Sequence, residues 1–295
     1  MEISKPRVVI VGVVRNCGRT VIAEYENLIQ ACKSLEVVDT FFVESDSDDG
    51  TKDRLSDLVN SFDNFHFESL PDLQETIPDR IERIRYCRNR YVSYLRNNFS
   101  SEDFDFVIVA DMDGINSAVS SYAIDSCFKF DNWDALFSNQ FFGLSDLLAL
   151  RAKGWLERDF LFELEAARVG LRKTFFKDNF IGDITRYLKY DQTRRQIIYK
   201  RMRFLGFRKR LIKVESAFGG IAVYRGWCFF KYDYENLESP KECEHVSFNL
   251  ALSEDGARLF INTRLINSFL NTYNMNKFFL IRLLRLWRWE RNKTF

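Results

Sequence analysis

Several features that define common classes of protein are missing from this 295-residue chain. It contains no run of about 18 uncharged apolar residues, so the sequence offers no membrane-spanning helix. Its six cysteines form no Cys-x-x-Cys pair, and no apolar segment of signal-peptide form precedes the first expected strand, so we expect a reducing, cytoplasmic location. The formal net charge of +1 excludes a uniformly basic protein, and we expect no nucleic-acid partner.

Linker composition is absent as well. No Gly-, Pro- or Ser-rich stretch separates residues 156 to 210 from the rest, although these residues change to a basic, helical pattern. We therefore predict a helical insertion at about residues 155–211 within a single domain that spans residues 1–275. The apolar content of 46% is enough for the core of one large α/β domain.

The most informative stretch is 105–114, where an apolar, β-branched run ends in Asp111 and Asp113. The run predicts a buried strand, and residues two apart in extended chain face the same way. Both carboxylates would then face one point beyond the strand, where Gly114 lets the backbone turn away. Mg²⁺ and Mn²⁺ favour such oxygen ligands and take one or two protein carboxylates when phosphates and waters supply the rest. An ordinary acidic turn is the alternative interpretation.

Two earlier runs, 8–14 and 37–44, predict parallel strands that end in polar loops. The first loop begins Arg15-Asn16, and its glycine spacing and its Arg19 exclude a P-loop, which requires a lysine there. Arg15 is either a phosphate contact or a solvated loop arginine. Glu44 and Asp46 lie where the second strand ends, in a turn whose composition is also typical of helix caps. Because ligands bind at the carboxyl ends of parallel strands, either carboxylate could accept hydrogen bonds from a base or ribose.

Later segments add three further candidates. The helical pattern over 77–98 carries Arg80, Arg83, Arg85, Arg88 and Arg90. We expect Arg88, with Asn89, to point inward and most of the others to form a solvated face. The segment 214–225 predicts a strand approached by a Gly-Gly step, where backbone comes close to a ligand. His245 is either a structural histidine or a third protein ligand for an Mn²⁺-class ion.

In chain order, these segments resemble a GT-A fold glycosyltransferase. The resemblance rests on Arg15-Asn16, the segment 44–51, Arg88-Asn89, the Asp111-Met112-Asp113 motif, the segment 215–220 and Cys243-Glu244-His245. More narrowly, the chain is similar to the capsule-associated mannosyltransferase-like family. The resemblance implies an α/β fold with a Rossmann-like, mixed and mostly parallel central sheet flanked by helices.

The resemblance also implies a function and a site. The donor would be a nucleotide-diphosphate sugar, GDP-mannose or a UDP-sugar, and the acceptor a hydroxyl of a growing glycan or lipid-linked saccharide in surface polysaccharide synthesis. The donor diphosphate would be bridged by Mn²⁺ or Mg²⁺. The residues implied as metal ligands are Asp111, Asp113 and His245; those implied for the donor nucleotide are Arg15, Asn16, Glu44, Asp46, Asp111 and Arg88; and those near the donor sugar and acceptor are Ser216, Phe218, Gly219 and Gly220.

The catalytic base stays open at this point. An inverting enzyme needs a carboxylate that deprotonates the acceptor hydroxyl, and Glu215, Glu242 and Glu244 are the candidates, with Arg88 acting on the donor. A retaining enzyme needs none of them. The two rival functions are a sugar nucleotidyltransferase, which usually has a Gly-rich loop followed by lysine, and a non-catalytic scaffold in glycan synthesis, which would be expected to lose its acidic ligands first.

The last segment, 276–295, predicts a basic amphipathic helix. Its apolar face carries Phe279, Leu280, Leu283, Leu284 and Trp287, and its arginines lie across from them. This pattern is typical of a helix that lies on an anionic membrane surface, which would make the protein peripheral on the cytoplasmic face. A terminal helix packed on the core is the alternative.

Overall fold

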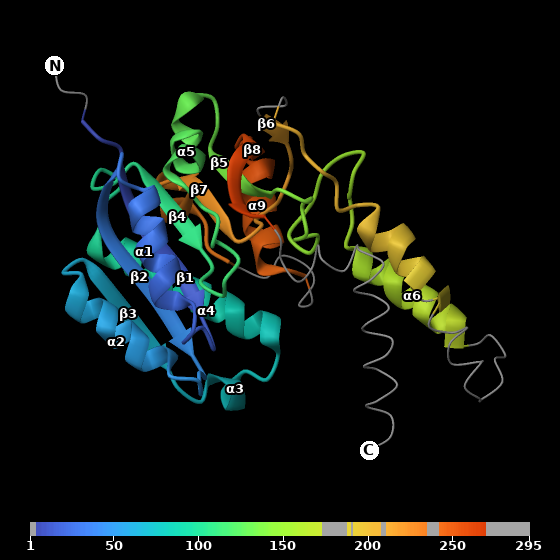
Figure 1. Cartoon of the computed structure of the whole chain (residues 1–295), viewed down its shortest axis with the longest axis horizontal. Coiled ribbons are helices and arrows are strands. Elements are labelled where there is room, and N and C mark those ends of the chain that lie inside the picture. The colour runs from blue at the N-terminus through green and yellow to red at the C-terminus, as the bar shows by residue number, and fades with distance from the viewer. Residues whose placement is uncertain (1–3, 173–187, 190, 208–210, 235–241, 270–295) are drawn as a thin grey trace.

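A computed structural model describes residues 4–172, 188–189, 191–207, 211–234 and 242–269. Within them one eight-stranded sheet has the order β3-β2-β1-β4-β7-β5-β8-β6 (Figure 1). The strands are β1 (Arg7–Val14), β2 (Glu36–Ser45), β3 (Phe65–Leu70), β4 (Phe106–Ala110), β5 (Ala135–Gln140), β6 (Leu211–Lys213), β7 (Ile221–Arg225) and β8 (Leu259–Ser268).

The sheet is mixed. Strands β1, β2, β3 and β4 pair in parallel, as do β5 and β8, whereas β7 is antiparallel to both β4 and β5, and β6 is antiparallel to β8. The expected mixed, mostly parallel sheet flanked by helices is therefore confirmed. The order β3-β2-β1-β4 reverses direction at β1, and in open α/β sheets this switch point forms a crevice beyond the carboxyl ends of the strands.

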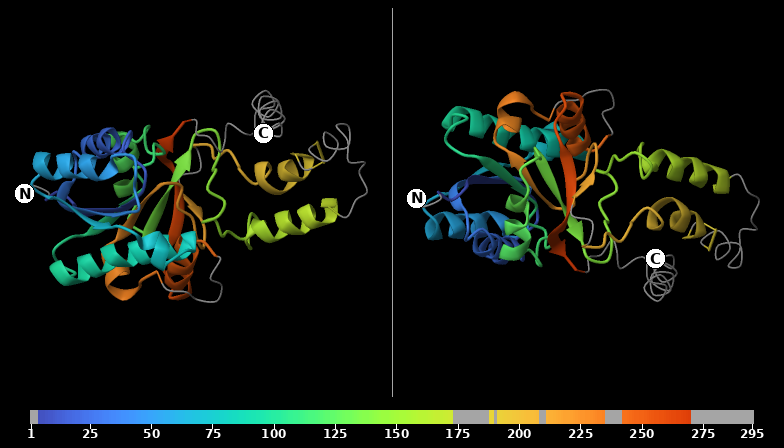
Figure 2. Two further views of the ribbon diagram at one scale, coloured as in Figure 1. Left: turned by 90° about the horizontal axis from the view of Figure 1, so that it is seen from below. Right: turned by 90° about the horizontal axis from the view of Figure 1, so that it is seen from above.

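The alternation of side chains along β1 explains why both faces are covered. Val8 and Ile10 pack in a core with α1 (Val21–Ala31), α2 (Thr51–Ser61) and α5 (Ser121–Asp125). Val9 and Val11 pack in a second core with α4 (Arg80–Asn98), α8 (Trp227–Lys231) and α9 (Glu244–Glu254). Figure 2 shows these helices as two layers on opposite sides of the sheet. Short helices at Leu73–Thr76 (α3) and Cys127–Lys129 (η1) complete the layers.

Part of the predicted helical insertion extends away from the sheet (Figure 1). Its described elements are α6 (Phe160–Arg172) and a π-helical turn, η2 (Arg195–Tyr199). Arg201, just after η2, pairs with Glu163 on α6 at 2.8 Å and so joins the two elements. Residues 173–187, 190 and 208–210 lie outside the described part of the chain, as does the tail at 276–295 on which the amphipathic-helix prediction falls.

Three predictions about local structure were wrong. The strand predicted over 214–225 spans only Ile221–Arg225, because Gly219 and Gly220 have φ of +83° and +106° and cannot continue it. The helix predicted from residue 77 begins at Arg80, where Asp79 caps it by accepting from two backbone N–H groups. Arg83 and Arg85 were expected on a solvated face, but both are buried.

The two buried arginines have local partners. Arg83 donates to the carbonyls of Ile77 and Pro78, and Arg85 pairs with Glu82 at 2.5 Å. Burial of these guanidinium groups therefore stabilises the start of α4.

Among the described residues, no helix has the length and apolar character needed to cross a membrane.

Candidate functional site

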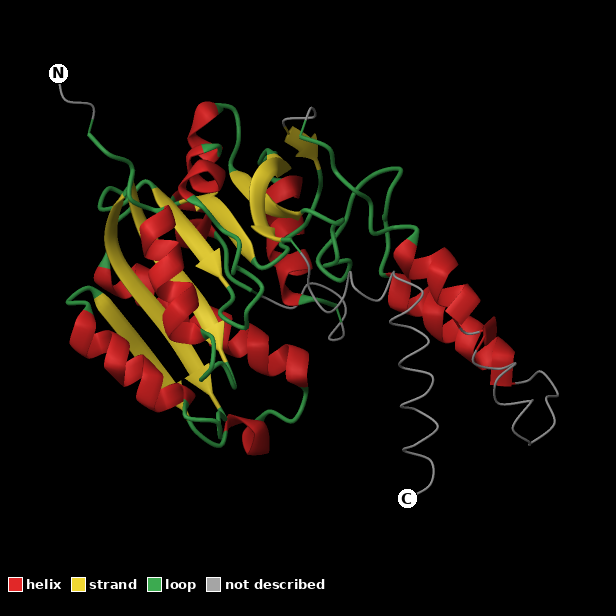
Figure 3. Cartoon of the chain, viewed as in Figure 1, coloured by secondary structure: helices red, strands yellow, loops and turns green. Residues whose placement is uncertain are grey.

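The carboxylates Asp111 and Asp113 follow β4 at the switch point of the sheet. All five residues of β4 are buried, and Met112 between the two carboxylates is also buried at 1% exposure. Asp113 is exposed, and the side chain of Asp111 retains 31% of its accessible surface. The alternation therefore places both carboxylates on the accessible side of the chain after β4, in one of the loops that join strands and helices (Figure 3).

Glu24, on the buried face of α1, supports the turn that follows β4. Its two carboxylate oxygens accept from the backbone N–H groups of Gly114 at 2.7 Å and Asn116 at 2.6 Å. Thr20, at the start of the same helix, donates to the carbonyl of Met112 at 2.6 Å. Burial raises the pKa of Glu24 to about 7, against the lowering effect of these two N–H donors. The turn after β4 is thus fixed by helix α1.

The Gly-Gly step lies on the other side of the same turn. The backbone N–H of Asp111 donates to the carbonyl of Gly220 at 2.9 Å, and Asn267 donates to the carbonyl of Gly219 at 2.8 Å. A Cβ at Gly219 would lie 2.6 Å from Ser138 Oγ, and one at Gly220 2.6 Å from Ile115 Cγ2. Both positions therefore require glycine for space as well as for their positive φ.

Arg88 reaches this site from α4 and is 3% exposed, as expected of an inward-pointing residue. Its Nε donates to Glu244 Oε1 at 2.8 Å, and its Nη2 lies 3.5 Å from Asp111 Oδ1. The rings of Phe218 and Tyr234 flank the guanidinium at 5.3 Å and 5.8 Å. The result is a cation held between two carboxylates and two aromatic rings.

Asn89 fixes the segment that contributes one of these rings. It donates to the Tyr234 carbonyl at 3.2 Å and accepts from the Tyr234 N–H at 2.7 Å. Tyr91 in turn donates to the Tyr234 hydroxyl at 2.7 Å. The two residues predicted to point inward therefore have different roles. Arg88 places a positive charge in the site, whereas Asn89 fixes the backbone of Tyr234.

Burial shifts the pKa values of Asp111 and His245, which both lie near Arg88, in opposite directions. It raises the pKa of Asp111 to about 7, because the lowering effect of Arg88 is smaller and Asp113 and Glu244 add to the rise. Burial and the nearby Arg88 charge together hold the pKa of His245 well below its usual range. His245 is therefore neutral at physiological pH.

His245 lies at the start of α9, next to Glu244. Its ring stacks on Phe218 with centroids 3.8 Å apart, and its Nε2 lies 3.7 Å from Glu244 Oε1. Neither ring nitrogen of this 2%-exposed side chain has a hydrogen-bond partner. A neutral imidazole with a free nitrogen has the chemistry of a metal ligand, but ring stacking alone also explains its burial.

The three residues predicted as metal ligands fit a divalent cation only in part. Among the residues that the structure describes, no group of three or more His, Cys, Asp or Glu side chains lies close enough to hold a metal. The set Asp111, Asp113 and His245 is therefore not assembled in this arrangement. The two carboxylates by themselves fit the mode in which Mg²⁺ or Mn²⁺ takes few protein ligands and the substrate supplies others.

The loop after β1 is closed against the loop after β2. The backbone N–H groups of Asn16, Cys17 and Gly18 donate to Ser47 Oγ, Thr51 Oγ1 and Asp49 Oδ2 at 3.0, 2.8 and 3.0 Å. A Cβ at Gly18 would lie 2.6 Å from the carbonyl of Asp49. Because the second loop occupies these donors, the first loop does not form a phosphate cradle, in line with the excluded P-loop.

The polar residues predicted to bind the nucleotide differ in their availability. Glu44 is fully buried and accepts from the Ser47 N–H and the Ser69 hydroxyl. Asp46 accepts from the Gln74 N–H at 3.0 Å through Oδ1, whereas its Oδ2 is buried without a partner. Arg15 is exposed and donates to Gln74 Oε1 at 2.6 Å. Asp46 therefore retains an unused acceptor, and Glu44 serves the loop.

The segment 215–220 divides between two sides. Ser216 is fully buried and donates to the carbonyl of Ala149, while Phe218 packs against Arg88 and His245. Glu215 is exposed in a separate cavity of about 650 Å³, which Glu242 also lines. Glu242 pairs there with the buried Arg151 at 2.7 Å. Of the three carboxylates considered as the catalytic base, Glu244 is the one beside Arg88.

Two acidic residues of the site were missed from the sequence. Glu24 lies on the apolar face of α1 between Val21 and Leu28, and a carboxylate on a buried stripe is a usable signal. Asp146 lies in the loop after β5, and it accepts from the N–H groups of Gly219 at 3.0 Å and Ala149 at 3.3 Å. Burial raises the pKa of Asp146.

Comparison with known proteins adds similarities of fold. No protein-family model and no curated protein sequence matches the chain. Among solved structures, it is similar to the mannosyltransferase PcManGT from Pyrobaculum calidifontis in complex with GDP-Man and Mn²⁺, at 10% identity and a TM-score of 0.47, covering 91% of this chain and 59% of that one. S. aureus TarS 1-349 gives 10% identity and 0.47, covering 92% and 62%.

A third similar structure is glucosyl-3-phosphoglycerate synthase from Mycobacterium tuberculosis in complex with Mn²⁺, UDP and phosphoglyceric acid. The identity is 11% and the TM-score 0.37, covering 90% of this chain and 67% of that one. The chain thus spans about three-fifths of the first two structures, which it matches over 59% and 62% of their length. At TM-scores of 0.47 or less, these similarities carry no argument about activity.

Proposed function

We propose that the chain is a metal-dependent glycosyltransferase of the GT-A type. The observation that carries the proposal is the position of Asp111 and Asp113 at the switch point of the sheet, with the buried cation Arg88 beside them. Ligands of open α/β sheets bind at this crevice. Carboxylates do not bind phosphates directly, so a pair of them beside a cation suits a diphosphate whose charge is bridged by Mn²⁺ or Mg²⁺.

The reaction is the transfer of a hexose from a nucleotide-diphosphate sugar, GDP-mannose or a UDP-sugar, to a hydroxyl group. When bound, the divalent cation would neutralise the charge that develops on the leaving diphosphate. Arg88 adds a second positive charge, fixed by Glu244 before the substrate arrives. Asp46, through its unpartnered Oδ2, accepts from the base or ribose of the donor, with Arg15 and Asn16 on the same side.

Glu244 serves as the base if the reaction inverts the anomeric centre. It lies in the same cluster as Arg88 and Asp111, whereas Glu215 and Glu242 line a different cavity. Arg88 lies 2.8 Å from Glu244 Oε1 and holds this carboxylate in place, and a carboxylate can take the proton of the acceptor hydroxyl. The donor sugar and the acceptor lie along Phe218 and the Gly-Gly step. We propose a glycan or lipid-linked saccharide in surface polysaccharide synthesis as the acceptor.

Two rival functions are less well supported. A sugar nucleotidyltransferase needs backbone donors for its triphosphate, but the N–H groups of Asn16, Cys17 and Gly18 are bonded to the neighbouring loop. A non-catalytic scaffold does not require Asp113 to be exposed beside a buried charge cluster. Both rivals predict that no sugar is released from a nucleotide sugar.

Localisation completes the proposal. The basic tail at 276–295 is proposed to bind an anionic membrane surface, which would hold the enzyme beside a lipid-linked acceptor on the cytoplasmic face. Flotation of the full chain and of a chain ending at residue 275 with anionic vesicles tests this part. Equal flotation of the two chains contradicts it.

The function itself is tested with a panel of nucleotide sugars and Mn²⁺. One donor is expected to raise the melting temperature, because a ligand that binds only the folded state stabilises it. The same donor is expected to be hydrolysed slowly without acceptor, and chelator is expected to abolish both effects. A panel in which no nucleotide sugar stabilises the protein contradicts the proposal.

A further inference from the structure

A cluster of phenylalanines lies exposed at the far end of the sheet from β3. Phe142, Phe204, Phe207 and Phe269 keep 45%, 61%, 43% and 56% of their accessible surface. They surround Phe141, with ring centroids 5.1, 6.2, 5.9 and 5.5 Å from it. We call these five residues the phenylalanine patch.

Three separate segments build the phenylalanine patch. Phe141 and Phe142 follow β5, Phe204 and Phe207 lie between η2 and β6, and Phe269 follows β8. Rings brought together from three segments, each with its outer surface in water, are unusual for a protein that also has two well-filled cores. Contiguous exposed apolar surface of this kind marks a site of interaction.

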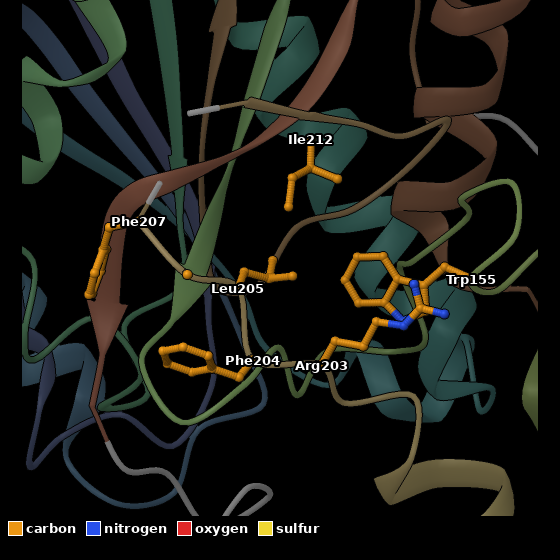
Figure 4. A pocket seen from close by; sticks show the side chains of 7 residues that line it. Trp155, Arg203, Phe204, Leu205, Phe207 and Ile212 are labelled. Atoms are coloured by element: carbon orange, nitrogen blue, oxygen red, sulfur yellow. The ribbon is translucent and has the colours of Figure 1, made fainter. Parts of the chain in front are cut away.

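A cavity of about 570 Å³ adjoins the patch (Figure 4). Leu205 and Ile212 line it together with Trp155, and Arg203 lies with its guanidinium 5.0 Å from the Trp155 ring. Phe204 and Phe207 stand on the opposite side of the opening in this view. The cavity is thus apolar inside and carries a cation at its edge.

The sequence around Phe204 and Phe207 is cationic. The segment 200–213 has seven Lys and Arg residues and no Asp or Glu, and Phe207 is followed directly by Arg208-Lys209-Arg210. Lys200 and Arg203 are exposed. Aromatic rings interleaved with cations are typical of surfaces that enter the headgroup region of an anionic membrane.

We propose that the phenylalanine patch is a membrane-contact surface that inserts its rings between the headgroups of an anionic lipid leaflet. The basic tail at 276–295 follows Phe269 closely in the sequence, so one lipid surface could serve both. The patch adds an apolar contact of the folded domain itself. Its binding does not depend on the transferase activity.

Charge distinguishes a lipid leaflet from the two other occupants of such a surface. A second copy of the chain would bring its own cationic 200–213 segment against this one. The chain's own tail carries six Lys and Arg residues over 276–295 against one acidic residue, Glu290. Both would meet like charge, whereas anionic lipid offers the opposite charge to every part of the surface.

The test is flotation of the full chain with vesicles of phosphatidylcholine and phosphatidylglycerol at low salt. F204D/F207D is expected to weaken vesicle binding by about 10-fold or more, because two rings leave the apolar interface. F162D is the matched control: Phe162 is 73% exposed but lies on α6 by the Arg151 cavity, so its replacement should leave flotation unchanged. Equal losses in both variants, or none in F204D/F207D, overturn the proposal.

Two further measurements separate the other occupants. If F204D/F207D turns a dimer into a monomer in sedimentation and floats like the wild type, the surface binds a second copy and the proposal is wrong. If the chain ending at residue 275 floats better than the full chain, the tail covers the patch and the proposal is wrong. F204W gives a readout that does not rely on a charge substitution. With anionic vesicles its fluorescence should shift further to the blue than that of the wild type, which already has five tryptophans, and an equal shift contradicts insertion.

Discussion

Two buried arginines each pair with a glutamate of the segment 242–244, and the two pairs differ in what they leave free. Arg151 pairs with Glu242 at 2.7 Å, and its Nη1 donates to the carbonyls of Leu148 and Leu150. Arg88 pairs with Glu244 at 2.8 Å, while its Nη2 faces Asp111 at 3.5 Å. In the first pair, the Arg151 guanidinium is occupied by Glu242 and by two neighbouring carbonyls, so this pair stabilises a loop. The second retains positive charge toward the accessible carboxylates, so it belongs to a site.

The largest effect is expected at Asp113, the exposed carboxylate two residues after Asp111. D113A is expected to lower sugar transfer by about 1,000-fold or more, because the divalent cation proposed to neutralise the diphosphate would lose a carboxylate ligand. Its melting temperature should stay that of the wild type, since Asp113 is exposed and accepts one local N–H at 3.3 Å. Transfer assays beside thermal unfolding measure both. Full activity in D113A would remove this carboxylate from the site.

The next test exchanges each arginine for lysine, which keeps the charge but loses the planar fork. R88K should lower kcat by about 100-fold, because the cation can no longer contact Glu244 and face Asp111 together. R151K should retain near-normal kcat and instead lower the free energy of unfolding by about 1–3 kcal/mol, because its carbonyl partners lose donors. Steady-state kinetics and urea unfolding of both variants separate the roles. The same pattern in both would erase the distinction.

The two glutamates sharpen the comparison further. E244Q should lower kcat by about 100-fold, whereas E242Q and E215Q should change it by less than about 3-fold. The carboxamide retains the size of the side chain, so a fall in activity without a fall in melting temperature points to lost charge. If E215Q proves the most damaging of the three, the acceptor binds in the Arg151 cavity and the base is Glu215.

The smallest expected effect is on stability as a function of pH. Glu24 and Asp111 each have a folded-state pKa raised from ordinary values of 4.5 and 3.8 to about 7. A raised pKa means that the folded state binds the proton more tightly than the unfolded state, so stability is lost as pH rises from about 4 through 7. In chelator, urea unfolding should show this fall, and E24Q should flatten part of it. A rise in stability over this range in the wild type contradicts the assignment.

Sequence reasoning located the residues whose surroundings are set by their own segment. Asp111 and Asp113 could be found because an apolar strand ends at them, and Arg88 because it lies deep in an amphipathic helix. The partners of these residues come from 90 to 156 positions away and could not be read from local pattern: Glu24 supports the turn after β4, and Glu244 fixes Arg88. Arg83 and Arg85 were mistaken for surface residues because their partners are carbonyl and carboxylate groups at the start of the same helix.

The residues proposed to bind the nucleotide show the same limit of prediction from local sequence. Strand ends predicted the position of Glu44 and Asp46, but the hydrogen bonds that occupy Glu44 come from Ser47 and from Ser69 on the neighbouring strand. Pairing between strands decides which acceptor is left over, and here it is Asp46 Oδ2. Only the folded arrangement distinguishes a carboxylate whose two oxygens both hold a loop from one that keeps an oxygen without a partner.

The central claim is that Asp111, Asp113 and Arg88 form a metal-assisted site for a nucleotide-diphosphate sugar. Calorimetric titration of the wild type and D113A with GDP-mannose and UDP-sugars, with Mn²⁺ and with chelator, tests it most directly. We expect one donor to bind the wild type with Mn²⁺, and its affinity to fall by about 10-fold or more in chelator and in D113A. Equal affinity with and without Mn²⁺ in both proteins would contradict the claim.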